Sequence, residues 1–266
     1  RHQSSRKMKD RKKKKLLFFL LLILFSAIFL FSTVYLAQYL IEQHRDEQEY
    51  DDLGDIVASI QGNLTEAPTK DPNTTEPDAT DPPVTQPTEP GILPEYLPLY
   101  QMNSDMVGWV KLEGTNINYP VMQTPDSPDY YLDKNFNKQT SKAGAIYVRE
   151  ACDVFKPSDN VVIYGHYISS GQQMFTHLHK YTKKSFWKEN QYIIFDTLYE
   201  HHVYQVFAVF KTSGTPGAGY PYHRFNDALD KEDFDKFIDD VKDLSFYNTG
   251  ITPQYGEKLI TLSTCD

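Results

Sequence analysis

The feature that most limits what this chain can fold into is an uncharged apolar run of 22 residues. It spans Leu16–Ala37 and reads LLFFLLLILFSAIFLFSTVYLA. A helix rises about 1.5 Å per residue, so a run of this length crosses a hydrocarbon core of about 30 Å. The alternative is a cleaved signal peptide, but its apolar region is usually about 7–15 residues long and ends in an A-x-A-like site, which this run lacks. The run therefore predicts a single transmembrane helix that is retained.

The charge distribution gives this helix a direction. Residues 1–15 contain nine of the 27 Lys and Arg residues and only one acidic residue, although the whole chain carries a net charge of −9. Positive residues beside a span stay on the cytoplasmic side. We therefore expect a basic cytoplasmic tail at residues 1–15, a cell-membrane anchor at residues 16–37 and an extracellular remainder. Because the basic block adjoins a membrane span, it does not indicate nucleic-acid binding.

Three further segments follow the predicted anchor. Residues 38–60 are charged and weakly periodic, which favours a juxtamembrane helix. Residues 61–91 contain seven Pro, seven Thr and no aromatic residue, so they cannot bury enough apolar surface to become ordered. Such a disordered stalk, extended at about 3.1 Å per residue, reaches ~100 Å. Residues 92–266 are long enough for one well-packed head domain.

The head reads as mainly β. Its apolar or alternating segments predict strands: GWVKL, NYPVMQ, GAIYV, NVVIYGHYI, QYIIFDTL, HHVYQVFAVFK and KLITLSTC. A short helix is expected at residues 95–103. One amphipathic helix is expected near residues 230–244, where four apolar residues recur at i, i+3, i+4 and i+7: Phe234, Phe237, Ile238 and Val241. Many strands with few helices indicate a β-barrel or sandwich with peripheral helices.

The two cysteines of the chain occupy different contexts. Cys265 follows the last predicted strand, whose alternation places it on one face with Thr261 and Ser263, at the strand tip. A thiolate there could act as a nucleophile. Cys152 lies in a polar stretch and is interpreted as an ordinary half-buried thiol. Because a nucleophile must stay reduced, we expect no structural disulfide.

A catalytic thiolate needs an imidazole partner, and the chain has eight histidines. His166 comes directly after the strand-like VVIYG, behind a glycine that we expect to permit a tight turn. The other seven lie near the membrane span, in a helix-like run, in a hairpin turn or in a loop. The residues alone favour His166 and leave the others open.

Together these motifs resemble a known family. TLSTC at the end of a strand, with IYGH about one hundred residues upstream, resembles the sortases, membrane-anchored cysteine transpeptidases of Gram-positive bacteria. The likeness extends through the whole head, beginning at LPEYLPLYQMNSDMVGWVKL. The amphipathic helix falls between the sixth and seventh strands, which is typical of class B. The resemblance implies a sortase-type β-barrel of about eight strands.

The resemblance also implies roles for individual residues. Cys265 would be the nucleophile and His166 the general acid and base. Ser263 and Thr264 would line the acyl site, and Leu132 and Tyr164 would contact the substrate. That substrate would be the sorting-signal peptide of surface proteins, and the acceptor a cell-wall amine of the peptidoglycan cross-bridge. No cofactor and no metal are implied.

One family feature is not found in this sequence. Sortases carry an arginine about ten residues beyond the cysteine, whereas the given sequence stops at Asp266. We expect that arginine and a final strand to lie beyond residue 266, in a longer protein. The other external arginines, Arg45, Arg149 and Arg224, are interpreted as solvated charges.

Two alternative functions stay open on the sequence. The first is a pilin-polymerising sortase that uses a pilin lysine as acceptor, although no aromatic plug precedes Ile92. The second is a stalked, non-enzymatic surface binding protein with an incidental cysteine. The sequence does not identify the sorting motif, the cargo or the acceptor amine.

Overall fold

The structure is a computed structural model that describes residues 2–65, 91–168, 173–215 and 217–264. It begins with one long helix, α1 (His2–Thr65), which contains the apolar run. The chain forms two compact units, Arg1–Arg45 and Asp46–Asp266, so α1 contributes to both.

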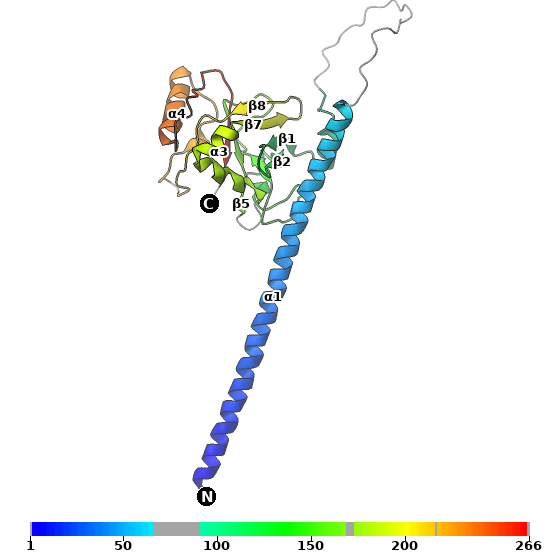
Figure 1. The fold of residues 1–266 in the computed structure, drawn as a ribbon, viewed down its shortest axis with the longest axis vertical. Coiled ribbons are helices and arrows are strands. Elements are labelled where there is room, and N and C mark those ends of the chain that lie inside the picture. Colours follow the sequence, from blue (N-terminus) through cyan, green and yellow to red (C-terminus); the bar gives the residue numbers. More distant parts are fainter. Residues whose placement is uncertain (1, 66–90, 169–172, 216, 265–266) are drawn as a thin grey trace, which may run out of the picture. The chain divides into compact units, whose positions relative to one another are not determined.

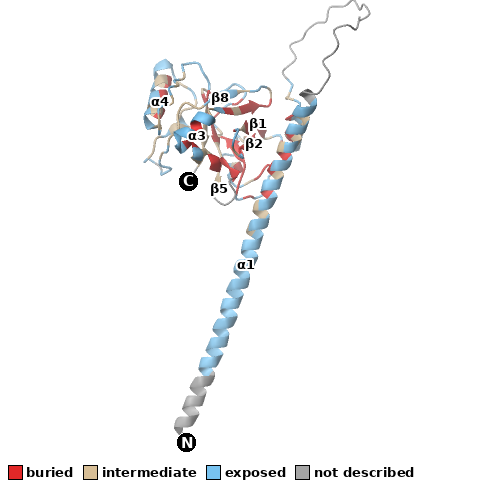
Figure 2. Ribbon diagram, in the orientation of Figure 1, coloured by how far each residue is buried: buried red, intermediate tan, exposed pale blue. Residues whose placement is uncertain are grey.

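The first unit is the amino-terminal part of α1. Its apolar side chains are exposed, including Phe31 at 76% and Ile23 at 65% (Figure 2). Among the described residues, α1 is the one helix long and apolar enough to cross a membrane. An apolar surface of this extent is unfavourable in water and suits a lipid environment.

The second unit is built on one mixed sheet of seven strands in the order β8-β7-β1-β2-β3-β4-β9 (Figure 1). The pairs β2–β3 and β4–β9 are parallel and the other neighbours are antiparallel. The sheet forms a nearly closed barrel around one apolar core, which confirms the predicted fold class. Its strands are β1 (Met106–Lys111), β2 (Asn118–Met122), β3 (Ile146–Val148), β4 (Asn160–Tyr164), β7 (Tyr192–Thr197), β8 (Val203–Gln205) and β9 (Leu259–Ser263).

Apart from the end of α1, the helices of this unit are short except for α4 (Lys231–Leu244), which matches the predicted amphipathic helix. Asp230 caps α4 by accepting a hydrogen bond from the Asp233 amide. Its four periodic apolar residues are buried together with Leu259 of β9. The remaining helical elements are α2 (Leu97–Met102), α3 (Lys184–Glu189), η1 (Tyr130–Leu132), η2 (Phe175–Thr182) and η3 (Tyr222–Arg224).

Two elements differ from the sequence prediction. The strand expected over HHVYQVFAVFK is confined to the three residues of β8, because the chain beyond it bonds outside the sheet. Val209, for example, accepts from the Phe246 amide and donates to the Ser245 hydroxyl. The strand expected over NVVIYGHYI is divided, because β4 ends at Tyr164 and Tyr167–Ile168 form a separate strand, β5. β5 pairs with β6 (Gln173–Met174), which was not predicted, in a small hairpin.

The carboxyl-terminal part of α1 belongs to the head unit. Tyr50, Leu53 and Val57 are at most 5% exposed and join the main core cluster. Their i, i+3, i+7 spacing places them on one helix face. The compact unit therefore starts at Asp46, whereas the sequence placed residues 38–60 outside the head. The helix also continues to Thr65, and residues 66–90 of the predicted stalk lie outside the described residues.

Candidate active site

The candidate site lies where β4 and β9 end side by side. The two strands run parallel in the register Asn160↔Leu259 to Tyr164↔Ser263, and the Gly165 amide donates to the Ser263 carbonyl at 3.1 Å. Because parallel neighbours end at the same edge of a sheet, Gly165 and Thr264 leave their strands at the same edge. His166 follows β4 at this edge.

The imidazole of His166 is held from one side. Its Nε2 atom lies 2.7 Å from the carbonyl oxygen of Leu132. A carbonyl oxygen can only accept, so Nε2 carries a proton and donates. Nδ1 is then the nitrogen available for proton exchange. The backbone is fixed as well, since the His166 carbonyl accepts from the Phe175 amide at 3.0 Å.

Gly165 is required here for a different reason from the one predicted. It is not among the glycines with a left-handed backbone, so no turn demands it. A Cβ atom at this position would instead lie 2.4 Å from Ile146 Cδ1 and 2.7 Å from the Phe175 ring. The glycine therefore lets β4 pack closely against its neighbours just before His166.

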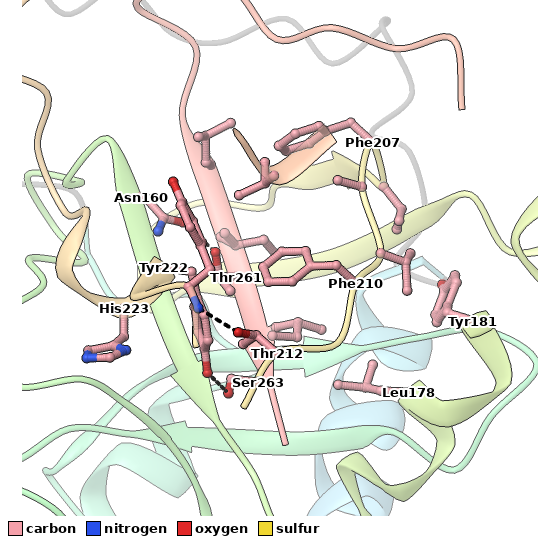
Figure 3. Close-up of a pocket in the computed structure, with 18 of the residues that line it drawn as sticks. Asn160, Leu178, Tyr181, Phe207, Phe210, Thr212, Tyr222, His223, Thr261 and Ser263 are labelled. Atoms are coloured by element: carbon pink, nitrogen blue, oxygen red, sulfur yellow. Dashed lines mark hydrogen bonds between the residues drawn. The ribbon is translucent and has the colours of Figure 1, made fainter. Parts of the chain in front are cut away.

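A cavity of ≈ 1800 Å³ opens beside β9 (Figure 3). It lies between that strand, residues 206–212 and the loop at residues 220–224, with Phe207 and Phe210 supplying apolar surface. The predicted substrate residues Tyr164, Ser263 and Thr264 all line it. The fourth, Leu132, is not part of the lining, and its side chain is 46% exposed. Leu132 reaches the site through the carbonyl that holds His166.

Tyr222 is a site residue that the sequence reasoning missed. Its hydroxyl lies 2.6 Å from Ser263 Oγ, so η3 is bonded to the end of β9 (Figure 3). Burial and the neighbouring Tyr222 raise the pKa of Tyr164, which keeps its phenol protonated and neutral at this edge. The only signal in the sequence was the cluster of aromatic and proline residues in GYPYHRF.

Arg149 is not the solvated charge that the sequence suggested. Its Nη1 donates to the His223 carbonyl at 2.6 Å and to Asn226 Oδ1 at 3.0 Å. It therefore ties the loop that carries Tyr222 to the residue following β3. Arg224 is exposed, as expected. Burial and the charges of these two arginines lower the pKa of His223, so that imidazole is neutral at pH 7.

Of the two cysteines, the structure describes Cys152. Cys152 is free and 5% exposed, and its sulfur accepts from the Val162 amide at 3.4 Å. Burial raises the pKa of this thiol, which disfavours the reactive thiolate. Cys265, the predicted nucleophile, lies outside the described residues. Within the described part of the chain, no cluster of His, Cys, Asp or Glu could hold a metal ion.

Comparisons with known proteins identify the family of this chain. A family profile for the sortase domain matches residues 110–266. Sortase B of Staphylococcus aureus is 32% identical over 175 residues, which cover 66% of this chain and 69% of that protein. Sortase B of Listeria monocytogenes is 33% identical over 172 residues, covering 65% and 67%.

Solved structures of sortase B are also similar to this chain. A complex of Staphylococcus aureus sortase B with a substrate is similar, with a TM-score of 0.70 and 26% identity over 85% of this chain and 90% of that one. A sortase B complexed with triglycine gives a TM-score of 0.69 at 25% identity, with coverage of 85% and 91%. These relatives give no support to the pilin-polymerising or non-enzymatic alternatives. The chain therefore belongs to the sortase family, as a class B sortase, and is a cysteine transpeptidase.

Proposed function

We propose that Cys265 is the nucleophile of this transpeptidase and that His166 is its general acid and base. The observation that carries the proposal is the parallel register Tyr164↔Ser263. His166 and Cys265 each follow their paired residue by two positions. Neighbouring strands lie about 4.8 Å apart, so this register favours a close approach of the two groups at one edge.

The proposed reaction has two halves. The Cys265 thiolate attacks a peptide carbonyl, and the protonated His166 gives its proton to the departing amine, which leaves a thioester on the enzyme. The acceptor amine then attacks the thioester. His166 takes the proton of that amine, an amide forms and the thiol is released. Nδ1 is the proposed site of both transfers, because Nε2 is bonded to the Leu132 carbonyl.

The proposed substrate is a C-terminal sorting-signal peptide, and the proposed acceptor is a cell-wall amine. The similar sortase B structures with a substrate and with triglycine support a peptide donor and a glycine-type amine acceptor. In this chain, Tyr164, Ser263 and Thr264 would meet the peptide at the end of the cavity. The exposed Leu132 side chain would add an apolar contact from the other side of His166.

We further propose that α1 anchors the enzyme in the cell membrane by a single span at residues 16–37. The exposed apolar side chains of the helix and the basic residues before them support this anchor. The positive-inside rule then gives the head an extracellular location. Protease added outside intact cells should digest the head and leave the basic tail.

Two measurements test the catalytic assignment. The thiol reagent MTSET should modify Cys265 in the folded chain and leave the buried Cys152 unmodified, as read by intact mass. Incubation with peptides from C-terminal sorting signals and triglycine should give an acyl-enzyme and a ligated product. Cys265→Ala and His166→Ala should each abolish ligation, whereas the exposed His44→Ala should not. Ligation that survives either catalytic substitution would refute the assignment.

A further inference from the structure

The part of α1 that belongs to the head contacts residues 135–144. This segment lies beside Leu132, whose carbonyl bonds to His166. Asp46 Oδ2 accepts from the Ser141 hydroxyl at 2.5 Å, and Glu49 Oε2 accepts from Asn135 Nδ2 at 2.8 Å. Tyr50 donates its hydroxyl to the Gly144 carbonyl at 2.8 Å. These three contacts, from one helix face, fasten the helix to residues 135–144.

Tyr50 is well suited to be a permanent donor. It is 4% exposed, and its ring packs edge-on against Tyr119 at 5.3 Å. Burial, followed by the charges of Glu49 and Asp46, raises the pKa of the Tyr50 phenol well above its ordinary value. The hydroxyl therefore stays protonated over the whole physiological range.

Gly144 passes this restraint to Leu132. Its backbone has φ +61°, and a Cβ atom there would lie 2.6 Å from the Leu132 carbonyl oxygen and 2.7 Å from the Tyr131 carbonyl oxygen. The two segments are also bonded on either side of this contact. The Ala145 amide donates to Tyr131 and the Ser141 amide to Asp133, both at 3.0 Å. Leu132 therefore cannot move independently of Gly144.

The last step leads to the imidazole. The same Leu132 carbonyl accepts the hydrogen bond from His166 Nε2 at 2.7 Å. The first and last links, from Tyr50 to Gly144 and from Leu132 to His166, are hydrogen bonds, and between them Gly144 packs closely against the Leu132 carbonyl. A shift of the helix in its groove would be transmitted to the oxygen that fixes the ring.

We propose that residues 46–57 of α1 form a positioning element of the active site, in which Tyr50 holds His166 in its working orientation through Gly144 and Leu132. Tyr50 is a positioning residue and touches no reacting atom. The proposal rests on the proposed function only for the consequence of this orientation, because the structural link to His166 stands whatever chemistry His166 performs. On this proposal, residues 46–57 of α1 contribute to the function of the enzyme as well as to its core.

The first test reads the ring of His166 without any assay of activity. The full chain is labelled with ¹⁵N-histidine, held in detergent micelles at pH 8.5 and studied by NMR. The ring signal of His166 is assigned as the one that is missing from the spectrum of His166→Gln. In the unchanged chain this ring should be mainly the Nε2–H tautomer. Tyr50→Phe should lower the Nε2–H fraction of His166. The matched control Tyr247→Phe also removes a phenol that donates to a carbonyl, that of Tyr181 at 2.7 Å, and should leave His166 unchanged.

A second variant guards against a folding defect. Glu49→Ala removes the bond to Asn135 at a less buried position and should change the His166 signals in the same direction, to a smaller extent. If folded Tyr50→Phe and Glu49→Ala both leave the His166 tautomer unchanged, the positioning proposal is wrong.

A kinetic test separates this proposal from the catalytic one. With a sorting-signal peptide and triglycine, Tyr50→Phe should lower kcat about fivefold and leave KM nearly unchanged, because one misoriented hydrogen bond corresponds to about 1 kcal/mol. If the tautomer shifts in Tyr50→Phe while His166→Ala keeps full activity, the positioning link holds and the catalytic role of His166 fails. A lower kcat with an unchanged tautomer would overturn the positioning proposal and leave the catalytic role standing.

Discussion

At Gly165 the barrel leaves no space for a side chain. This close packing restricts the backbone immediately before His166. The hydrogen atoms of the glycine face Ile146 and the Phe175 ring, and the chain reaches His166 one residue later. The histidine is thus oriented by packing on one side and by the Leu132 carbonyl on the other. A single methyl group at residue 165 disturbs the first of these restraints.

Gly165→Ala should therefore impair both stability and activity. Overpacking a well-filled core costs about 1–3 kcal/mol, so urea unfolding should show a loss of that size, together with slower modification of Cys265 by MTSET. Gly62→Ala is the matched control, because a Cβ there meets nothing within 4 Å and lies in α1. It should raise helix stability by about 0.5–1 kcal/mol. Equal stability of the two variants would contradict the packing argument.

The buried thiol of Cys152 predicts a pH dependence. Its pKa is raised in the folded state by burial, above the value of about 8.5 for a free thiol. Protonation then favours the folded state, so this stabilisation is complete below about pH 8.5 and is lost as the pH rises through the folded pKa. Cys152→Ala should flatten the fall in unfolding free energy between pH 8 and 10. An unchanged slope in Cys152→Ala would show that the thiol does not titrate as expected.

Among the elements, the loop at residues 220–226 is held by contacts in its carboxyl-terminal half. Arg149 donates to the His223 carbonyl and to Asn226, while Phe225 stacks on Phe237 of α4 at 4.0 Å and 7°. Immediately before these anchors, Tyr222 reaches Ser263. The loop is consequently an ordered wall of the cavity.

Arg149→Lys tests how much this wall matters. A lysine keeps the charge but loses the planar group whose Nη1 makes both bonds, so the loop should loosen. We expect a loss of about 1–3 kcal/mol in unfolding free energy and a KM for sorting peptide that rises more than kcat falls. Arg224→Lys, at an exposed position, should change stability by less than about 0.5 kcal/mol. A larger effect on kcat than on KM would show that Arg149 acts on the reaction itself.

The sequence predicted elements whose signals are local. The 3.6-residue period of α4 and the apolar strands β1 to β4, β7 and β9 were read correctly from their patterns. The docked face of Tyr50, Leu53 and Val57 was not, because three apolar residues among many acids do not show what they pack against. Likewise, the pairing of Tyr222 with Ser263 joins residues 41 apart and has no local signature. The role of Leu132 rests on its backbone carbonyl, a group that every residue has.

For the head as a whole, the titration of its tyrosines is the most measurable property. Burial raises the pKa of nine tyrosines among the described residues: Tyr50, Tyr96, Tyr119, Tyr131, Tyr164, Tyr181, Tyr204, Tyr220 and Tyr247. That of Tyr119 rises to about 12. Since unfolded tyrosines ionise near pH 10, the folded state retains protons that the unfolded state releases.

The head should therefore unfold cooperatively at high pH. The tyrosine contribution to stability is complete below about pH 10 and falls as the pH rises through the folded pKa values. Absorbance at 295 nm should show exposed phenols ionising first, and a second step should coincide with loss of the far-UV circular dichroism signal. A single ionisation step near pH 10 with circular dichroism unchanged would contradict the burial of these phenols.

The pairing of β4 with β9 also sets the moment at which the enzyme can first act. Thr261 of β9 bonds to Asn160 of β4, which precedes it by 101 residues in the chain. A ribosome must therefore add about a hundred residues after the start of β4 before that strand can pair with β9. Domains fold largely as units, and such distant pairings form late. We therefore expect chains that end before β9 to have no transpeptidase activity. Detectable activity would then indicate that β4 and β9 have paired.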